Sequence, residues 1–141
     1  MPEFVLDMGT SEAARDFNKL DSFTRGYIEA AFWTDANADM SEDLEGATFA
    51  ELADESLTSI IEDCSAFQKD NAVMLEQAYT SELVAYDESR AGTDFWLTRN
   101  RHGAGYWDRG LGKIGTALSD AAHVYGTSSL YRGDTGAVHV S

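Results

Sequence analysis

The chain has 141 residues, of which 43% are hydrophobic and 16 are aromatic (7 Phe, 6 Tyr and 3 Trp), and its formal net charge is −15. A chain this rich in aromatic residues is not a disordered acidic tail, and its charge repels nucleic acid and anionic membranes while attracting basic protein surfaces. Its single cysteine, Cys64, excludes an intramolecular disulfide bond and is typical of a reducing compartment.

The charge is divided unevenly along the chain. Residues 1–88 contain 21 acids and 4 bases, whereas residues 89–141 contain 4 acids and 6 bases, which gives net charges of −17 and +2. We predict one domain with an acidic helical part (1–88) and an α+β part (89–141). The N-terminus does not resemble a signal peptide, and no apolar run approaches the roughly 20 residues of a membrane-spanning helix. We therefore expect a cytoplasmic protein with no membrane contact.

Helical spacing of apolar residues dominates the acidic part of the chain. It predicts a helix over residues 21–34, with Asp21 as the N-cap, and a short helix over residues 49–54. A longer helix is predicted over residues 55–79, and the apolar period lapses at residues 68–71. We expect the long helix to bend at this lapse.

The pattern changes after Arg90, where aromatic residues and glycines become frequent. The predicted elements are a strand at 94–99, a returning strand at 104–107, a helix at 111–125 and a closing hairpin at 129–140. Gly126 stands where a glycine commonly ends a helix. The sequence therefore predicts an α+β fold in which N-terminal helices pack on one face of a small antiparallel sheet of ββ-α-ββ order.

An acidic stretch at residues 35–46 partly fits a calcium-binding loop, because oxygen ligands alternate along it. Met40 replaces the glycine that such a loop needs, however, and Gly46 replaces its bidentate glutamate. The histidines of the chain also lack the spacing of a transition-metal site. We predict an exposed acidic loop here, and neither a metal nor a cofactor in the protein.

The densest group of polar side chains lies after the predicted strand at 94–99. Its candidate site residues are Arg99, Asn100, His102 and Asp108. His102 and Asp108 are the residue types of a general base and its orienting acid, although no serine or cysteine nucleophile accompanies them. One hypothesis is a small enzyme or ligand-binding module at this turn. The other is a structural turn braced by arginine and aspartate side chains. We assign no catalytic residue.

Two segments resemble the signatures of an uncharacterised family of small acidic proteins encoded by bacteriophages and mobile elements. They are residues 20–33 (LDSFTRGYIEAAFW) and residues 94–108 (DFWLTRNRHGAGYWD). The resemblance extends from about Leu20 to Gly136 and implies a genomic context rather than an activity. Relatives usually carry glycine at the position of Arg101, so a turn with positive φ would be strained here.

By analogy with phage proteins of this kind, our leading hypothesis is a non-enzymatic inhibitor with a DNA-mimic-like acidic surface. Such a protein would bind a basic, nucleic-acid-binding host protein in the host cytoplasm, as anti-restriction and anti-CRISPR proteins do, and would not bind nucleic acid itself. The predicted contact residues are Asp39, Glu42, Asp43, Glu45, Glu55, Glu62, Asp63 and Asp70. A homodimer formed through aromatic residues is a further alternative.

Overall fold

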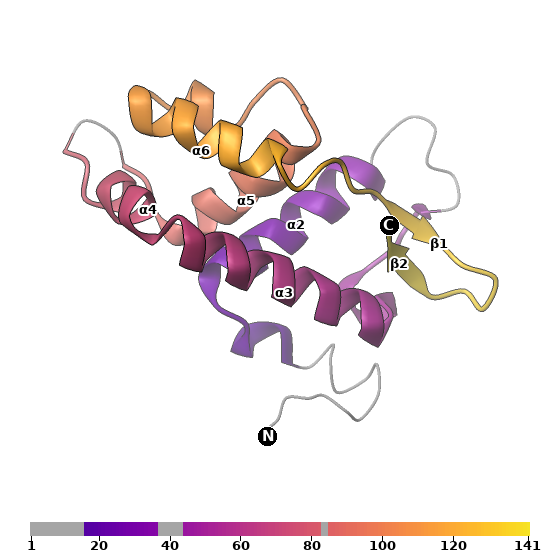
Figure 1. Ribbon diagram of the computed structural model, residues 1–141. Coiled ribbons are helices and arrows are strands. Elements are labelled where there is room, and N and C mark those ends of the chain that lie inside the picture. The colour runs from indigo at the N-terminus through magenta and orange to yellow at the C-terminus, as the bar shows by residue number, and fades with distance from the viewer. Residues whose placement is uncertain (1–15, 37–43, 83–84) are drawn as a thin grey trace.

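Most of the chain that the structure describes is helical. The computed structural model describes residues 16–36, 44–82 and 85–141. Its α-helices and strands are α2 (Ser22–Ala36), α3 (Asp54–Asp70), α4 (Ala72–Tyr79), α5 (Glu88–Arg99), α6 (Lys113–His123), β1 (Leu130–Arg132) and β2 (Val138–Val140). Short 3-10 helices are η1 (Asp16–Lys19), η3 (Phe49–Glu51) and η4 (Tyr106–Asp108). Figure 1 shows α2 and α5 in the interior, with α3 and α4 along one side and α6 along another.

The closest helix pair in the fold is α2 with α5. A Cβ atom on Gly92 of α5 would lie 1.8 Å from the carbonyl oxygen of Phe23, and one on Gly26 of α2 would lie 2.1 Å from that of Ser89. Thr93 Oγ1 donates a hydrogen bond of 3.1 Å to the Gly26 carbonyl at the same crossing. The two helices come this close because glycine has no side chain at the points of contact.

The helices predicted for the acidic part are confirmed. Asp21 caps α2, because its Oδ1 accepts a hydrogen bond of 2.7 Å from the Thr24 N–H. The predicted long helix is divided into α3 and α4 at Asn71, which lies at the expected bend. The Asn71 side chain donates to the Phe67 carbonyl at 2.9 Å, so it competes for an acceptor of the helical backbone. The short helix predicted at 49–54 is η3.

The strand predicted at 94–99 is wrong, since these residues form the second half of α5. Every residue from Asp94 to Arg99 is buried, including the polar ones, so the segment has no exposed face and its consecutive apolar residues resemble a buried strand. The returning strand predicted at 104–107 is also wrong, because a loop and η4 occupy this region. The ββ-α-ββ order is therefore not found, although the mixture of helices with a small antiparallel sheet is α+β in the broad sense.

The end of the chain matches its prediction more closely. Helix α6 lies within the predicted range 111–125, and Gly126 after it has a positive φ of 74°. Strands β1 and β2 form the predicted antiparallel hairpin, with Tyr131 opposite His139. The hairpin is joined to the start of α3, because the Ala53 N–H donates to the Val138 carbonyl at 2.8 Å.

Aromatic rings fill the core between the helices. Phe67 of α3 stacks on Phe95 of α5 with ring centroids 4.2 Å apart, and Phe95 also contacts Tyr27 of α2 at 5.3 Å. These side chains are at most 1% exposed, and each contributes about 1.5–3 kcal/mol by burial. The core thus combines residues from both sides of residue 88. Within the described ranges, no helix has the length and apolar character needed to cross a membrane.

Candidate functional site

The signature segment 94–108 begins in the interior of the protein, and Arg99 is its most highly connected residue. The side chain of Arg99 is 6% exposed, and its guanidinium donates to the carbonyls of Gly126 and Tyr125 at 2.8 and 3.0 Å. It also donates to Tyr27 Oη and to Asp63 Oδ2, both at 3.0 Å. Arg99 therefore joins α2, α3 and the residues after α6. All of these contacts are internal to the fold.

Asn100 is also part of the internal framework. Its Oδ1 accepts a hydrogen bond of 2.7 Å from the Ser128 N–H, and its Nδ2 donates to the Trp96 carbonyl at 3.1 Å. The amide thereby connects the end of α5 to the segment that precedes β1. The side chains of Arg99 and Asn100 are engaged with the protein itself, as expected for a structural turn.

His102 and Asp108 lie on the surface, in contrast to Arg99 and Asn100. Both are exposed, and among the described residues no hydrogen bond joins His102 to Asp108. The structure therefore divides the four predicted residues of this site into two internal supports, the buried Arg99 and the half-buried Asn100, and two exposed side chains. It does not bring them together around one cavity.

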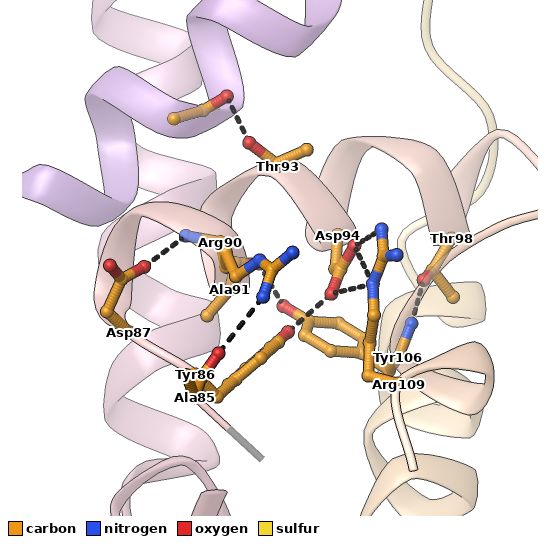
Figure 2. Close-up of polar contacts among 11 residues, drawn as sticks. Ala85, Tyr86, Asp87, Arg90, Ala91, Thr93, Asp94, Thr98, Tyr106 and Arg109 are labelled. Carbon is orange, nitrogen blue, oxygen red and sulfur yellow. Dashed lines mark hydrogen bonds and ion pairs between the residues drawn. The ribbon is translucent and has the colours of Figure 1, made fainter. Parts of the chain in front are cut away.

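A buried carboxylate that the sequence did not single out lies one helical turn before the end of α5. Asp94 is fully buried and accepts a hydrogen bond of 2.5 Å from Tyr86 Oη. Arg109 donates to the same carboxylate from Nε and Nη2, at 2.7 to 3.1 Å (Figure 2). The sequence did contain a signal for this buried carboxylate, because Asp94 directly precedes the apolar residues Phe95, Trp96 and Leu97. A charged group among buried apolar residues requires a partner.

The electrostatics of this cluster follow from burial and from the carboxylate charge. Burial raises the pKa of Tyr86, and the negative charge of Asp94 raises it further. The hydrogen bonds that Arg109 donates to the Asp94 carboxylate raise the pKa of Arg109. Tyr86 therefore remains a neutral hydrogen-bond donor and Arg109 remains charged. The cluster is a satisfied ion pair that fixes the second half of α5 against the segment after η4, and Tyr86 connects it to the segment before α5.

Two open depressions lie beside the central helix pair. One, of about 570 Å³, is adjacent to Tyr86 and is lined by Tyr79, Ser81, Ala85, Tyr86, Asp87, Ser89 and Arg90. The other, of about 430 Å³, is lined by Glu29, Ala30, Trp33, Thr93 and Leu97. At the first depression the Tyr79 hydroxyl is buried and has no hydrogen-bond partner among the described residues, and Arg90 donates to the Ala85 carbonyl at 3.0 Å. Among the residues that the structure describes, no hydrogen bond in either depression pairs a base with a nucleophile.

Cys64, the only thiol of the chain, is not available as a nucleophile. Its side chain is fully buried in α3, and burial raises its pKa well above the usual range. The reactive form of cysteine is the thiolate, which this environment disfavours. Cys64 is therefore a small apolar residue of the core.

The carboxylates predicted to contact a partner have different positions. Asp39, Glu42 and Asp43 lie outside the described residues. Glu45, Glu55, Glu62 and Asp70 are exposed. Asp63 is half-buried and forms an ion pair of 3.0 Å with Arg99, so its carboxylate already has an internal partner.

Most of the acidic stretch at 35–46 also lies outside the described residues, except at its two ends. Asp35 accepts a hydrogen bond of 2.9 Å from the Leu130 N–H, which connects the end of α2 to β1. Among the residues that the structure describes, no group of three or more His, Cys, Asp or Glu side chains is placed to hold a metal ion. No protein-family model, curated protein or solved structure matches this chain.

Proposed function

We propose that this chain is a non-enzymatic inhibitor, of the type encoded by bacteriophages, that binds a basic, nucleic-acid-binding host protein. The binding surface is formed by the exposed carboxylates of α3 and α4, which take the place of nucleic-acid phosphates. The observation that carries the proposal is that no ion pair within the described part of the chain neutralises this surface.

Ion pairs within the described part of the chain use three carboxylates, namely Asp63, Asp94 and Glu51. The exposed acids on α3 and α4 have no such partner; they are Asp54, Glu55, Glu62, Asp70 and Glu76. Lys69 is the only base in the sequence of these two helices. Unpaired like charges on one surface cost stability through mutual repulsion, and a basic partner removes this cost on binding.

The length of the surface fits a nucleic-acid groove. From Glu55 to Asp70, α3 rises about 22 Å at 1.5 Å per residue, which is close to the rise of roughly six base pairs of duplex DNA. Glu55 and Glu62 are seven residues apart and therefore lie on the same side of the helix. A cationic groove that accepts a short stretch of duplex could accept this helix in its place.

The test compares two triple variants of equal charge. In the first, Glu55→Gln, Glu62→Gln and Asp70→Asn neutralise α3. In the second, Glu29→Gln, Asp120→Asn and Asp134→Asn neutralise exposed acids on other elements. Each variant has a net charge of −12, three units above the −15 of the natural chain.

Each protein is immobilised and exposed to host lysate at about 0.05 M salt, and bound proteins are eluted at about 0.5 M salt, where screening removes surface attraction. We expect the natural chain and the second variant to capture the same basic protein and to inhibit its DNA binding, and the first variant to do neither. Equal loss in both variants would show that only bulk charge matters. Unchanged inhibition by the first variant would exclude α3 as the surface.

A further inference from the structure

The loop after α5, together with the first residues of η4, presents three side chains to solvent. We call residues 100–107 the Arg101 loop. Arg101 and His102 are exposed, and the Trp107 side chain is 54% exposed. Within the described part of the chain, none of these three side chains makes a hydrogen bond, an ion pair or a ring contact. Figure 1 shows the chain between α5 and α6 as an arch on the outside of the helical core.

The backbone of the loop is strained at Arg101. Its φ is 58°, and no other non-glycine residue in the described ranges has a positive φ. A residue with a Cβ atom pays for this conformation, whereas glycine adopts it freely. In return, the described residues receive no hydrogen bond, ion pair or ring contact from the Arg101 side chain. An arginine that costs stability, and whose side chain makes no hydrogen bond or ion pair with the described residues, is best explained by a contact outside the chain.

The supports of the loop are rigid. The Arg101 and His102 N–H groups donate to the Thr98 and Leu97 carbonyls at 3.1 and 3.0 Å, and the Tyr106 N–H donates to Thr98 Oγ1 at 3.1 Å. Tyr106 itself is fully buried, and its hydroxyl donates to the Ala91 carbonyl at 2.7 Å (Figure 2). The exposed side chains therefore extend from a fixed frame, which reduces the entropy lost on binding.

We propose that the Arg101 loop is a second binding surface, which accepts an acidic segment of a partner protein in which a carboxylate lies beside an apolar or aromatic side chain. Arg101 forms a bidentate ion pair with the carboxylate, and Trp107 packs against the neighbouring apolar group. Tryptophan and arginine are the residue types that most often dominate protein–protein binding energy. This surface uses none of the residues of the α3 surface. A test that refutes one of the two binding surfaces therefore leaves the other unaffected.

An exposed arginine and tryptophan could bind a nucleic acid, a second copy of the chain or a short acidic protein segment. The net charge of the whole protein opposes the first two more than the third. A nucleic acid brings a long series of phosphates into the field of a chain with a net charge of −15. A second copy of the chain brings the same net charge. A short protein segment places one or two carboxylates at the loop only. The loop can attract no more than this number of carboxylates, because the exposed Asp108, which follows Trp107 directly, repels them.

The experiment is an NMR titration of the ¹⁵N-labelled full chain with a short synthetic peptide in which an aspartate stands on each side of a tryptophan. A control peptide carries lysines in place of the aspartates, and a third probe is a short single-stranded oligothymidine. We expect the acidic peptide to shift the Arg101 and His102 amides and the Trp107 indole N–H, and the other two probes to leave them unchanged.

Two variants and one control separate binding from folding. Arg101→Gly and Trp107→Ala should each weaken binding of the acidic peptide about fivefold or more, as truncation of an interface anchor does. Trp33→Ala, which removes another exposed tryptophan, should not. Arg101→Gly should also melt at an equal or higher temperature, because glycine relieves the positive φ.

Several results would overturn the proposal. Shifts confined to other residues, or unchanged affinity in both variants, would exclude the loop as the site. Equal binding of the lysine peptide, or tighter binding of the oligonucleotide, would exclude an acidic segment as the ligand. Self-association in sedimentation that Trp107→Ala abolishes would make a second copy the partner. A lower melting temperature for Arg101→Gly would show that the arginine has a structural role.

Discussion

Replacement of Gly92 by alanine tests the central feature of the fold, the close approach of α2 and α5. An added Cβ would lie 1.8 Å from the Phe23 carbonyl oxygen, about 1.6 Å closer than ordinary van der Waals contact. Backbone atoms lie on both sides of this contact, so no flexible side chain can move aside. Separating the helices would also loosen the packing of Phe95 and Trp96, both fully buried. Overpacking typically costs 1–3 kcal/mol, and we expect about 3 kcal/mol here.

The sign of the change makes this prediction decisive. If helix propensity dominated, alanine would stabilise α5 by about 1 kcal/mol relative to glycine. Urea unfolding followed by tryptophan fluorescence measures the difference, and a loss of about 3 kcal/mol lowers the midpoint by roughly 1–2 M. Ser65→Ala on the exposed face of α3 is the control and should change stability by at most a few tenths of a kcal/mol. A midpoint for Gly92→Ala equal to or above that of the natural chain would refute the close helix crossing.

Three further predictions concern the polar groups of the interior. Asp94→Asn should cost about 3 kcal/mol, because it leaves the partly buried Arg109 without its counter-ion, whereas the exposed Asp120→Asn should change the free energy of unfolding by less than about 0.5 kcal/mol. Arg99→Lys should cost about 2 kcal/mol in the same urea assay, since an ammonium cannot serve the carbonyls and the phenol together; an unchanged midpoint would contradict the contacts described. Burial raises the pKa of several tyrosines, among them the buried Tyr27, Tyr86 and Tyr106. A raised pKa means that the folded state keeps these phenols neutral while the unfolded state ionises, so their stabilisation is complete below about pH 10 and falls above it by about 1.4 kcal/mol per pH unit for each phenol. Urea midpoints between about pH 9 and 11 would show this decline, and phenols that titrate normally in the folded protein would contradict it.

Elements with one buried face could be predicted from the sequence, and the element buried on all sides could not. Helices α2, α3 and α6 each carry apolar residues at helical spacing beside exposed polar ones, so their periodicity indicated them correctly. In α5, eight of the twelve residues are buried, and Phe95, Trp96 and Leu97 follow one another as in a buried strand. The missed signals were Asp87, which caps the helix through the Arg90 N–H at 2.9 Å, and the length of the segment.

The candidate site shows a different limit. The sequence identified residues 94–108 as the densest polar region, but it could not separate supports from exposed groups. That separation depends on partners far along the chain: Arg99 meets Asp63 and Tyr125, and Asn100 meets Ser128. Spacing within the segment carries no information about such contacts. The positive φ of Arg101 agrees with the strain expected there, and in the structure the strain belongs to the exposed part of the segment.

The division of charge along the sequence is not a division into an acidic and a basic face. Three of the six bases in residues 89–141 form ion pairs with internal carboxylates; they are Arg99, Arg109 and Arg132. The pairs of Arg99 and Arg132 reach acids in the first 88 residues, so these bases join the two parts of the chain. The C-terminal part therefore offers little basic surface to balance the carboxylates of α3 and α4. Arg101 and Lys113 are exposed and have no hydrogen-bond or ion-pair partner among the described residues, and of the two only Arg101 has a strained backbone. This is why we assign the acidic surface and the Arg101 loop to different partners.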